Sequence, residues 1–285
     1  VEVALYCGDN LGLAAWLHGQ NRRYQLIYID PPFNSGKAYR ARVDGSRGRR
    51  SAGVPAYTDG RDLDAYLQWI EPRLRHCYDL LANDGTLYVH LDWHTVHYVK
   101  VLLDRIFGRE RFLNEIIWCY HGPSPITSAF NRKHDTILVY TRSKDYYFDA
   151  DAVRIPYDPS TIKTFRSSPR AGFGKVPDLE RGKVPEDWWY FPVVARLHGE
   201  RIGYETQKPL ALLQRIIGAS SAPGDSVLDL FAGSGTTGVA AASLGRSAVL
   251  ADSNPLAIEK ALVRLGRLDP RPDVSVWRTA DEARD

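Results

Sequence analysis

Four consecutive residues have the types and the order that chemistry on an amine requires. They are Asp30, Pro31, Pro32 and Phe33, and they directly follow the apolar segment 24–29, which reads as a buried strand. A strand that ends in this way places a carboxylate at its carboxyl end, where α/β sheets bind ligands. A proline-capped strand end without any further role is the plain alternative.

The chemistry that suits this group is alkylation of an exocyclic amine on a nucleobase. Such a nitrogen is a poor nucleophile, because its lone pair is delocalised into the ring. Asp30 can accept one N–H of the amine, and the Pro31 carbonyl can accept the other, since proline fixes the backbone. Together they would drive the nitrogen toward tetrahedral geometry. Phe33 can stack on the base, a contact worth roughly 1–3 kcal/mol.

A second group of residues, in segment 226–238, has the pattern of a strand, a glycine turn and a helix. Gly233 and Gly235 permit a tight turn and the close approach of a ligand, and the N-terminus of the following helix favours an anionic group. Asp252 stands about 20 residues later, at the end of the next strand, where an acid commonly binds a ribose diol. These features predict a ligand that contains adenosine. The full glycine pattern of dinucleotide sites is absent, and a purely structural turn stays open.

Alternating apolar strands and amphipathic helices position these groups. Periodicity predicts strands at 24–29, 86–91, 114–120, 136–140, 226–230 and 247–251. It predicts helices at 62–81, 95–107, 209–220, 236–244 and 255–265. Strands that alternate with helices indicate right-handed βαβ units and a mostly parallel sheet.

Two stretches carry many basic residues and little periodicity. Residues 35–60 are rich in Gly, Ser and Arg and read as a surface loop. Residues 121–200 mix prolines, aromatic residues and basic residues, and read as an inserted recognition region. Both are candidates for contact with DNA phosphates, although a solvated surface is the plain alternative. The candidate residues are Arg40, Arg42, Arg47, Arg49, Arg50, Arg132 and Lys133.

Composition limits the class of protein. The 285 residues are 44% hydrophobic and 25% charged, which excludes a disordered chain, a collagen-like fibre and a coiled coil. No apolar run approaches the roughly 18 residues of a membrane span. The three cysteines lack disulfide or zinc spacing, and His90, His94 and His97 are spread over a strand and a helix. We therefore expect no metal and a reducing, cytoplasmic setting.

On these motifs the chain resembles the β class of amino DNA methyltransferases, which use S-adenosylmethionine. Residues 30–33 match the catalytic motif of that family, and residues 231–235 match its cofactor motif. The catalytic motif comes first in the chain, which is the permuted order of the β class. Segments 7–9 and 203–209 also fit the family. Segments 90–93 and 114–118 resemble adenine-specific members related to type III modification subunits.

The resemblance implies a Rossmann-like methyltransferase fold. This is an α/β fold with a mostly parallel, seven-stranded sheet and helices on both faces. Residues 1–120 would form the catalytic half of one methyltransferase domain, and residues 201–285 would form its cofactor-binding half. Residues 121–200 would be the inserted target-recognition region.

The resemblance also assigns roles to single residues. Residues 30–33 would be catalytic. Asp9 would contact the adenine of the cofactor, and Asp252 would bind its ribose. Thr206 and Lys208 would lie near its carboxylate, and the two turn glycines near its methionyl part. The full cofactor-binding set would be Asp9, Thr206, Lys208, Asp229, Phe231, Gly233, Gly235, Thr236 and Asp252.

The predicted reaction is site-specific methyl transfer from S-adenosylmethionine to adenine N6 in duplex DNA. The target atom is inaccessible inside a stacked duplex, so base flipping is expected. Cytosine N4 stays open as the target, as does a catalytically silent DNA-binding or partner subunit with the same fold; RNA or a glutamine amide is less favoured. Cytosine C5 is excluded, since no cysteine follows a proline. The family implies a homodimer, and a partner in a restriction–modification system stays open.

Overall fold

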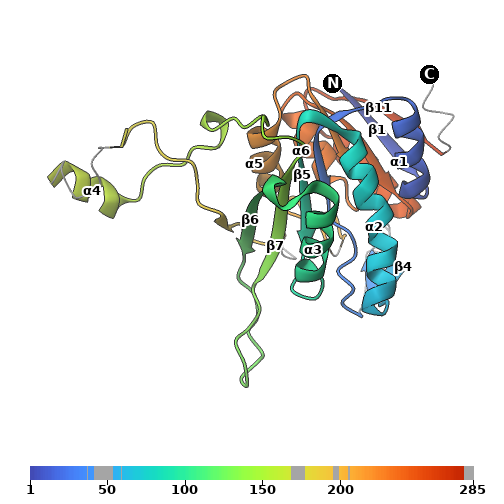
Figure 1. The fold of residues 1–285 in the computed structure, drawn as a ribbon, viewed down its shortest axis with the longest axis horizontal. Helices are drawn as coiled ribbons and strands as arrows, with labels where there is room; N and C mark the ends of the chain where they lie inside the picture. Colours follow the sequence, from blue (N-terminus) through green and yellow to red (C-terminus); the bar gives the residue numbers. More distant parts are fainter. Residues whose placement is uncertain are drawn as a thin grey trace.

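The computed structural model describes residues 1–36, 38–41, 54–58, 60–167, 177–194, 199–204 and 206–278. In this part of the chain, one sheet of nine strands runs through the molecule and is covered by helices on both faces (Figure 1). The strand order is β11 (Asp273–Trp277), β1 (Glu2–Cys7), β10 (Ser247–Asp252), β9 (Ser226–Asp229), β2 (Tyr24–Ile29), β5 (Leu81–Leu91), β7 (His134–Thr141), β6 (Phe112–Cys119) and β8 (Trp188–Tyr190).

The sheet is mostly parallel, which confirms the predicted fold class. The six strands from β11 to β5 are parallel to one another, whereas β7 is antiparallel to both of its neighbours. Among the described residues, however, this sheet has nine strands and not the seven expected. The strands β1, β8 and β11 were not among the predicted ones. The strand β8 has three residues and β11 is largely exposed at the sheet edge, so neither produces an apolar alternation of useful length.

Helices bury apolar side chains against both faces of this sheet. One face is covered by α1 (Asn10–Gly19), α2 (Leu63–Leu80) and α3 (Val96–Phe107). The other is covered by α5 (Leu210–Ser220), α6 (Thr236–Ser243) and α7 (Pro255–Leu265). Asp62 begins α2, because its carboxylate accepts hydrogen bonds of 3.1 Å from the N–H groups of Asp64 and Ala65. The helices α2, α3, α5, α6 and α7 confirm the five predicted ones to within one residue at each end, whereas α1 was not predicted.

The interpretation of residues 35–60 as a surface loop is wrong for two of its parts. Residues 38–41 and 54–58 pair as the antiparallel strands β3 (Ala38–Ala41) and β4 (Val54–Thr58). Short strands with Arg, Pro and Gly around them have the composition of a loop, which is why composition alone misleads here. Arg40 lies within β3. The other arginines proposed there, Arg42, Arg47, Arg49 and Arg50, lie outside the described residues.

The range 121–200 contributes two strands, β7 and β8, to the main sheet. Its other described parts are a long loop between β6 and β7 and an excursion that carries α4 (Pro159–Ser167) far from the sheet (Figure 1). A role of these parts in target recognition stays a prediction.

The topology brings three acidic residues to one edge of the sheet. Asp30 follows β2, Asp229 ends β9 and Asp252 ends β10, and these three strands are parallel. Parallel strands end at the same edge, which is where open α/β sheets bind ligands. Among the described helices, none is both long and apolar enough to cross a membrane.

Candidate active site

A pocket of about 340 Å³ lies at this edge of the sheet. Ten of the residues singled out in the sequence line it, namely Asp9, Asp30, Pro32, Thr206, Lys208, Asp229, Phe231, Gly233, Thr236 and Asp252. The two sequence groups, which are far apart in the chain, thus meet in one cavity. Pro31, Phe33 and Gly235 are not among the lining residues.

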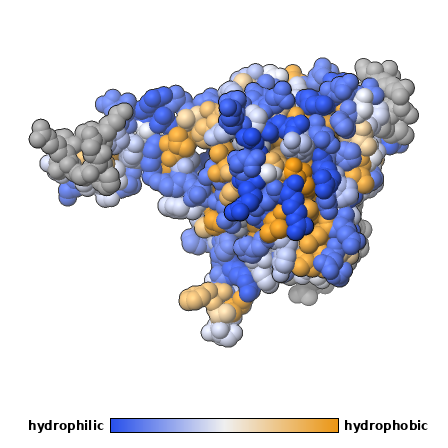
Figure 2. Space-filling model, in the orientation of Figure 1, coloured by the Kyte–Doolittle hydropathy of each residue, from blue (hydrophilic) through white to orange (hydrophobic). Residues whose placement is uncertain are grey.

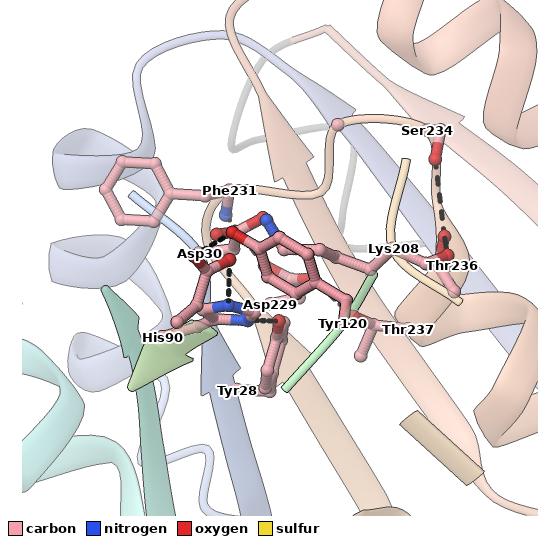
Figure 3. Close-up of polar contacts among 12 residues, drawn as sticks. Tyr28, Asp30, His90, Tyr120, Lys208, Asp229, Phe231, Ser234, Thr236 and Thr237 are labelled. Atoms are coloured by element: carbon pink, nitrogen blue, oxygen red, sulfur yellow. Dashed lines mark hydrogen bonds and ion pairs between the residues drawn. The ribbon is translucent and has the colours of Figure 1, made fainter. Parts of the chain in front are cut away.

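The carboxylate of Asp30 has two different oxygens. Oδ2 lies 2.7 Å from Lys208 Nζ, and the two side chains are only 17% and 11% exposed (Figure 3). Oδ1 is also buried, but no described residue donates a hydrogen bond to it. A buried acceptor is nearly always paired in a native protein. Oδ1 therefore keeps an unused acceptor site, on a residue that lines the pocket.

Behind this carboxylate lies a buried chain of polar side chains. His90 Nδ1 is 2.7 Å from the Tyr28 hydroxyl (Figure 3). His90 Nε2 is 3.2 Å from Asp135 Oδ2. Asp135 Oδ1 accepts a hydrogen bond of 3.0 Å from the Tyr120 hydroxyl. Burial opposes ionisation of Asp135, yet the contact with His90 holds its pKa below the usual range. The Phe33 ring packs on His90 with 5.8 Å between ring centroids, so this chain supports the catalytic motif from behind.

The glycine turn after β9 is tied to the end of β10. Gly233 N donates to Asp252 Oδ2 and Asn254 N donates to Asp252 Oδ1, each at 2.8 Å. Burial raises the pKa of Asp252 to about 6. Gly233 has a φ of +49°, and a Cβ there would lie 3.4 Å from the Tyr204 ring. The absence of a side chain at Gly233 therefore keeps the pocket open between the turn and Tyr204.

Gly235 serves packing in this structure. Its φ is +75°, and a Cβ would lie 2.5 Å from the Ala261 Cβ of α7. Contact with the cofactor stays a prediction for Gly235, whereas its close approach to α7 is a sufficient reason for glycine at this position.

Asp229 is buried under the turn. Its Oδ1 accepts from Phe231 N at 2.8 Å, and its Oδ2 accepts from the Thr237 hydroxyl at 2.5 Å. Burial raises the pKa of Asp229 to about 7. Because both oxygens bind the turn and the start of α6, the geometry favours a role of Asp229 in shaping the pocket.

A buried arginine that sequence reasoning missed holds the same turn from α7. Arg264 Nη1 donates to the Thr236 hydroxyl at 2.7 Å and to the Ser234 carbonyl at 3.0 Å. Burial lowers the pKa of Arg264 to about 10. In the sequence Arg264 looks like an ordinary cation near a helix end, and only the turn packed on α7 reveals its partners.

The far wall of the pocket is built around Arg73, which sequence reasoning also missed. Its guanidinium lies 3.3 Å from Asp9 Oδ1 and donates to Asn10 Oδ1 at 2.8 Å. It also lies 4.3 Å above the Trp69 ring. Asp9 meanwhile caps α1 by accepting from Gly12 N at 3.2 Å. The spacing of Trp69 and Arg73, four residues apart on α2, is the sequence signal that would have placed them together.

The segment before α5 delivers Lys208 to the pocket. The Gln207 side chain accepts from Ile202 N at 3.1 Å and donates to the Glu200 carbonyl at 2.7 Å. These bonds join Gln207 to residues 200 and 202, and Lys208, the next residue, enters the pocket beside Asp30. Thr206 lines the same wall.

Two predicted DNA contacts in the loop between β6 and β7 have partners within the protein. The Arg132 guanidinium lies 4.1 Å above the Trp93 ring, and Lys133 Nζ donates to the Pro123 carbonyl at 2.6 Å. Both partners are uncharged, so both cations keep their net charge. Contact with DNA stays a prediction for these two residues.

Two of the three histidines in segment 90–97 form side-chain contacts within the protein. His90 belongs to the buried chain above, and His94 Nδ1 lies 2.7 Å from Asp92 Oδ2. Elsewhere in the described residues, His18, His76 and Asp79 have ligand atoms within 4.8 Å of one another, but they do not line the pocket.

Comparisons with known proteins agree with this geometry. Residues 24–262 match a protein family described as DNA methylase, whose model covers N6 and N4 methyltransferases. The chain is 32% identical over 266 residues to the type II methyltransferase M.HpaI of Haemophilus parainfluenzae, which covers 93% of this chain and 74% of that protein. It is 30% identical over 245 residues to the DNA adenine methyltransferase YhdJ of Escherichia coli, covering 84% and 75% of the two chains.

Solved structures share the fold. The M1.HpyAVI–SAM complex matches with a TM-score of 0.62 at 20% identity, over 93% of this chain and all of that one. TTHA0409 of Thermus thermophilus, a putative DNA modification methylase complexed with S-adenosyl-L-methionine, matches with a TM-score of 0.61 at 21% identity, over 96% and 98% of the chains. The match to most of the chain, together with relatives of 30% identity or more, shows that this protein belongs to the DNA methylase family of N6 and N4 methyltransferases.

Proposed function

We propose that this protein transfers a methyl group from S-adenosylmethionine to N6 of adenine in duplex DNA, with the target base flipped out of the duplex to the catalytic motif at the side of the pocket. The observation that carries the proposal is the buried, unpartnered Oδ1 of Asp30 beside Pro31 and Phe33. Oδ1 would accept one N–H of the amine, and the Pro31 carbonyl would accept the other. Phe33 would stack on the base. As the nitrogen takes up the methyl group it releases one proton, and Oδ1 is placed to receive it.

The pocket suits S-adenosylmethionine in volume and in chemistry. Its volume, about 340 Å³, is in the range of small-molecule sites. A carboxylate has about four lone-pair sites, and the two N–H groups that bind Asp252 leave two for ribose hydroxyls. Asp9 would lie by the adenine, and Thr206 and Thr236 by the amino-acid end. When bound, the cofactor supplies an electrophilic methyl group on a sulfonium.

Adenine is favoured over cytosine as the target. The first position of the catalytic motif is Asp30, and an aspartate there is typical of the adenine-specific members that the chain resembles. One relative of 30% identity is named as a DNA adenine methyltransferase. A homodimer, a restriction partner and a cytoplasmic location remain predictions that rest on resemblance and composition.

Product analysis tests the proposal. The protein is incubated with S-adenosylmethionine and mixed-sequence duplex DNA, and the digested nucleosides are identified by mass spectrometry. We expect N6-methyladenine. N4-methylcytosine would keep the mechanism and correct the target, and the absence of both, with cofactor binding shown by calorimetry, would contradict the proposal. Asp30→Ala is the matched variant, and we expect it to lose methyl transfer while it still binds the cofactor.

A further inference from the structure

The loop between β6 and β7, residues 120–133, leaves the sheet at the edge that carries the active site. Strand β5 ends at this edge, and in the antiparallel register its Leu91 faces Thr136 of β7. Cys119, at the end of β6, pairs with His134, at the start of β7. The loop that joins them therefore begins and ends at the carboxyl edge, and Figure 1 shows it as a long projection beyond the body of the molecule.

An apolar side chain stands uncovered on this loop. Phe130 is 100% exposed, the largest value among the large apolar residues described, and Ile126 is 40% exposed. Figure 2 shows apolar surface at the end of the same projection. Full burial of a phenylalanine is worth about 1.5–3 kcal/mol. Phe130 gains none of this by packing against the described residues, so packing within that part of the chain does not explain an apolar residue here.

Hydrogen bonds give the loop a defined shape. Asn131 Oδ1 accepts from Ile126 N at 3.1 Å, and Asn131 Nδ2 donates to the Ile126 carbonyl at 3.0 Å. This reciprocal pair closes the loop directly around Phe130. Near the sheet, the bond from Lys133 to the Pro123 carbonyl joins the two arms. The exposed ring is thus carried on a preformed tip, which reduces the entropy lost when a partner covers it.

The base of the loop is joined to the catalytic motif. Tyr120 N donates to the Lys133 carbonyl at 3.0 Å, and the Tyr120 hydroxyl binds Asp135. Asp135 contacts His90, and the ring of His90 packs on Phe33. The loop and the residue proposed to stack on the target base therefore share one buried support.

The charge at the loop base indicates the kind of partner. The Arg132 and Lys133 side chains bind an indole ring and a carbonyl, so their positive charges are not cancelled by these contacts. This combination of cations and an exposed apolar tip suits a nucleic acid as the partner. The cations would bind the phosphates on its outside, and the apolar tip would contact the base stack inside.

We propose that Phe130, with Ile126 beside it, inserts into duplex DNA and occupies the space that the flipped adenine leaves in the base stack. This inference rests on the proposed function and names a residue that would drive base flipping. Extrusion of a base costs a few kcal/mol of pairing and stacking. An apolar wedge between base steps compensates for part of that loss. An arm of about six residues spans at most roughly 20 Å, which sets the reach of the loop from the sheet edge.

Substrates that differ in base pairing test the proposal. The wild-type protein is first used to map its methylated sites by sequencing. Two duplexes with such a site are then compared, one with the target adenine paired to thymine and one with the adenine opposite an abasic position. For Phe130→Ala we expect kcat/KM to fall at least tenfold on the paired duplex and less than twofold on the unpaired one, where extrusion is already easy. Phe130→Leu, which keeps an apolar wedge, should recover most of the loss.

A matched control separates insertion from other effects. Phe148 is 42% exposed and lies outside the loop. Phe148→Ala therefore removes an exposed phenyl ring elsewhere, and we expect kcat/KM to stay unchanged on both duplexes. Equal losses on both duplexes with Phe130→Ala would overturn the wedge in favour of a general DNA contact, and unchanged rates on the paired duplex would overturn it outright. If the wild-type protein methylates no DNA, the proposed function fails at the mapping step, before any variant is compared.

Discussion

Lys208 Nζ lies 2.7 Å from Asp30 Oδ2, and this contact joins the segment before α5 to the end of β2. Both side chains are mostly buried, so their attraction is less screened by solvent than that of a surface pair. The contact occupies one oxygen of the carboxylate and restrains its orientation, while Oδ1 has no hydrogen-bond partner among the described residues. Lys208 therefore has the geometry of a residue that positions Asp30.

The first prediction concerns this pair. Lys208→Ala should lower kcat by about tenfold to a hundredfold, which corresponds to about 1.4–2.7 kcal/mol of lost transition-state stabilisation. Lys208→Arg, which keeps the charge, should recover part of the activity. Steady-state methylation assays and calorimetric titration of the cofactor provide the measurement. A normal kcat with a raised KM for the cofactor would instead place Lys208 at the cofactor carboxylate.

The second prediction concerns the close approach of α6 and α7. Gly235→Ala would put a Cβ 2.5 Å from the Ala261 Cβ at a φ of +75°. Strain and overpacking together should lower the free energy of unfolding by about 2–4 kcal/mol and weaken cofactor binding.

Gly19 offers the control for this substitution. A Cβ at Gly19, at the end of α1, would have no heavy atom within 4 Å. Gly19→Ala should therefore be neutral or stabilise the protein by about 0.5–1 kcal/mol. Urea unfolding of both variants compares them, and equal stabilities would contradict the packing role of Gly235.

The sequence was sufficient to predict the residues whose position depends on one local element. Asp30 and Asp252 end apolar strands, and parallel strands end at one edge, so their meeting in a pocket follows from the chain pattern. The six strands that periodicity predicted are also present in the structure. The three residues of β8 are too few to show a periodic pattern, and this strand forms because it pairs with β6.

Contacts between distant segments could not be predicted in this way. Lys208 was expected near the cofactor carboxylate, and nothing local indicates that its ammonium pairs with Asp30. Arg73 and Arg264 have the sequence appearance of solvent-facing helix cations, yet both are buried because a cap or a turn from another segment packs over them. Such partners depend on tertiary packing, which periodicity does not report.

The third prediction concerns the pH dependence of cofactor affinity. Burial raises the pKa of Asp252 to about 6. Below that pH the carboxyl group is protonated and loses an acceptor site for a ribose hydroxyl. The dissociation constant for S-adenosylmethionine should therefore rise as the pH falls from 7 to 5. Asp252→Asn should bind weakly at every pH with a flatter profile. An identical pH profile for both proteins would show that another group is responsible.

The fourth prediction concerns the pH dependence of stability, through Asp229. Burial raises the pKa of Asp229 to about 7 in the folded protein, from an ordinary value of 3.8. Between these two values the folded state binds a proton that the unfolded state has released, so the free energy of unfolding falls as the pH rises through this window. Above about pH 7 the full cost of the buried charge is present, at about 1.4 kcal/mol for each unit of displaced pKa.

Asp229→Asn removes this titration. The altered bonds to Phe231 N and the Thr237 hydroxyl add an offset that does not depend on pH. The stability of the wild type relative to the variant should therefore decrease by a few kcal/mol between pH 4.5 and pH 8. Urea unfolding at several pH values measures this difference. Asp252 and the other titrating groups are common to both proteins and largely cancel. A difference that stays constant across the range would mean that Asp229 is ionised throughout, and that the bonds to the turn outweigh the cost of its burial.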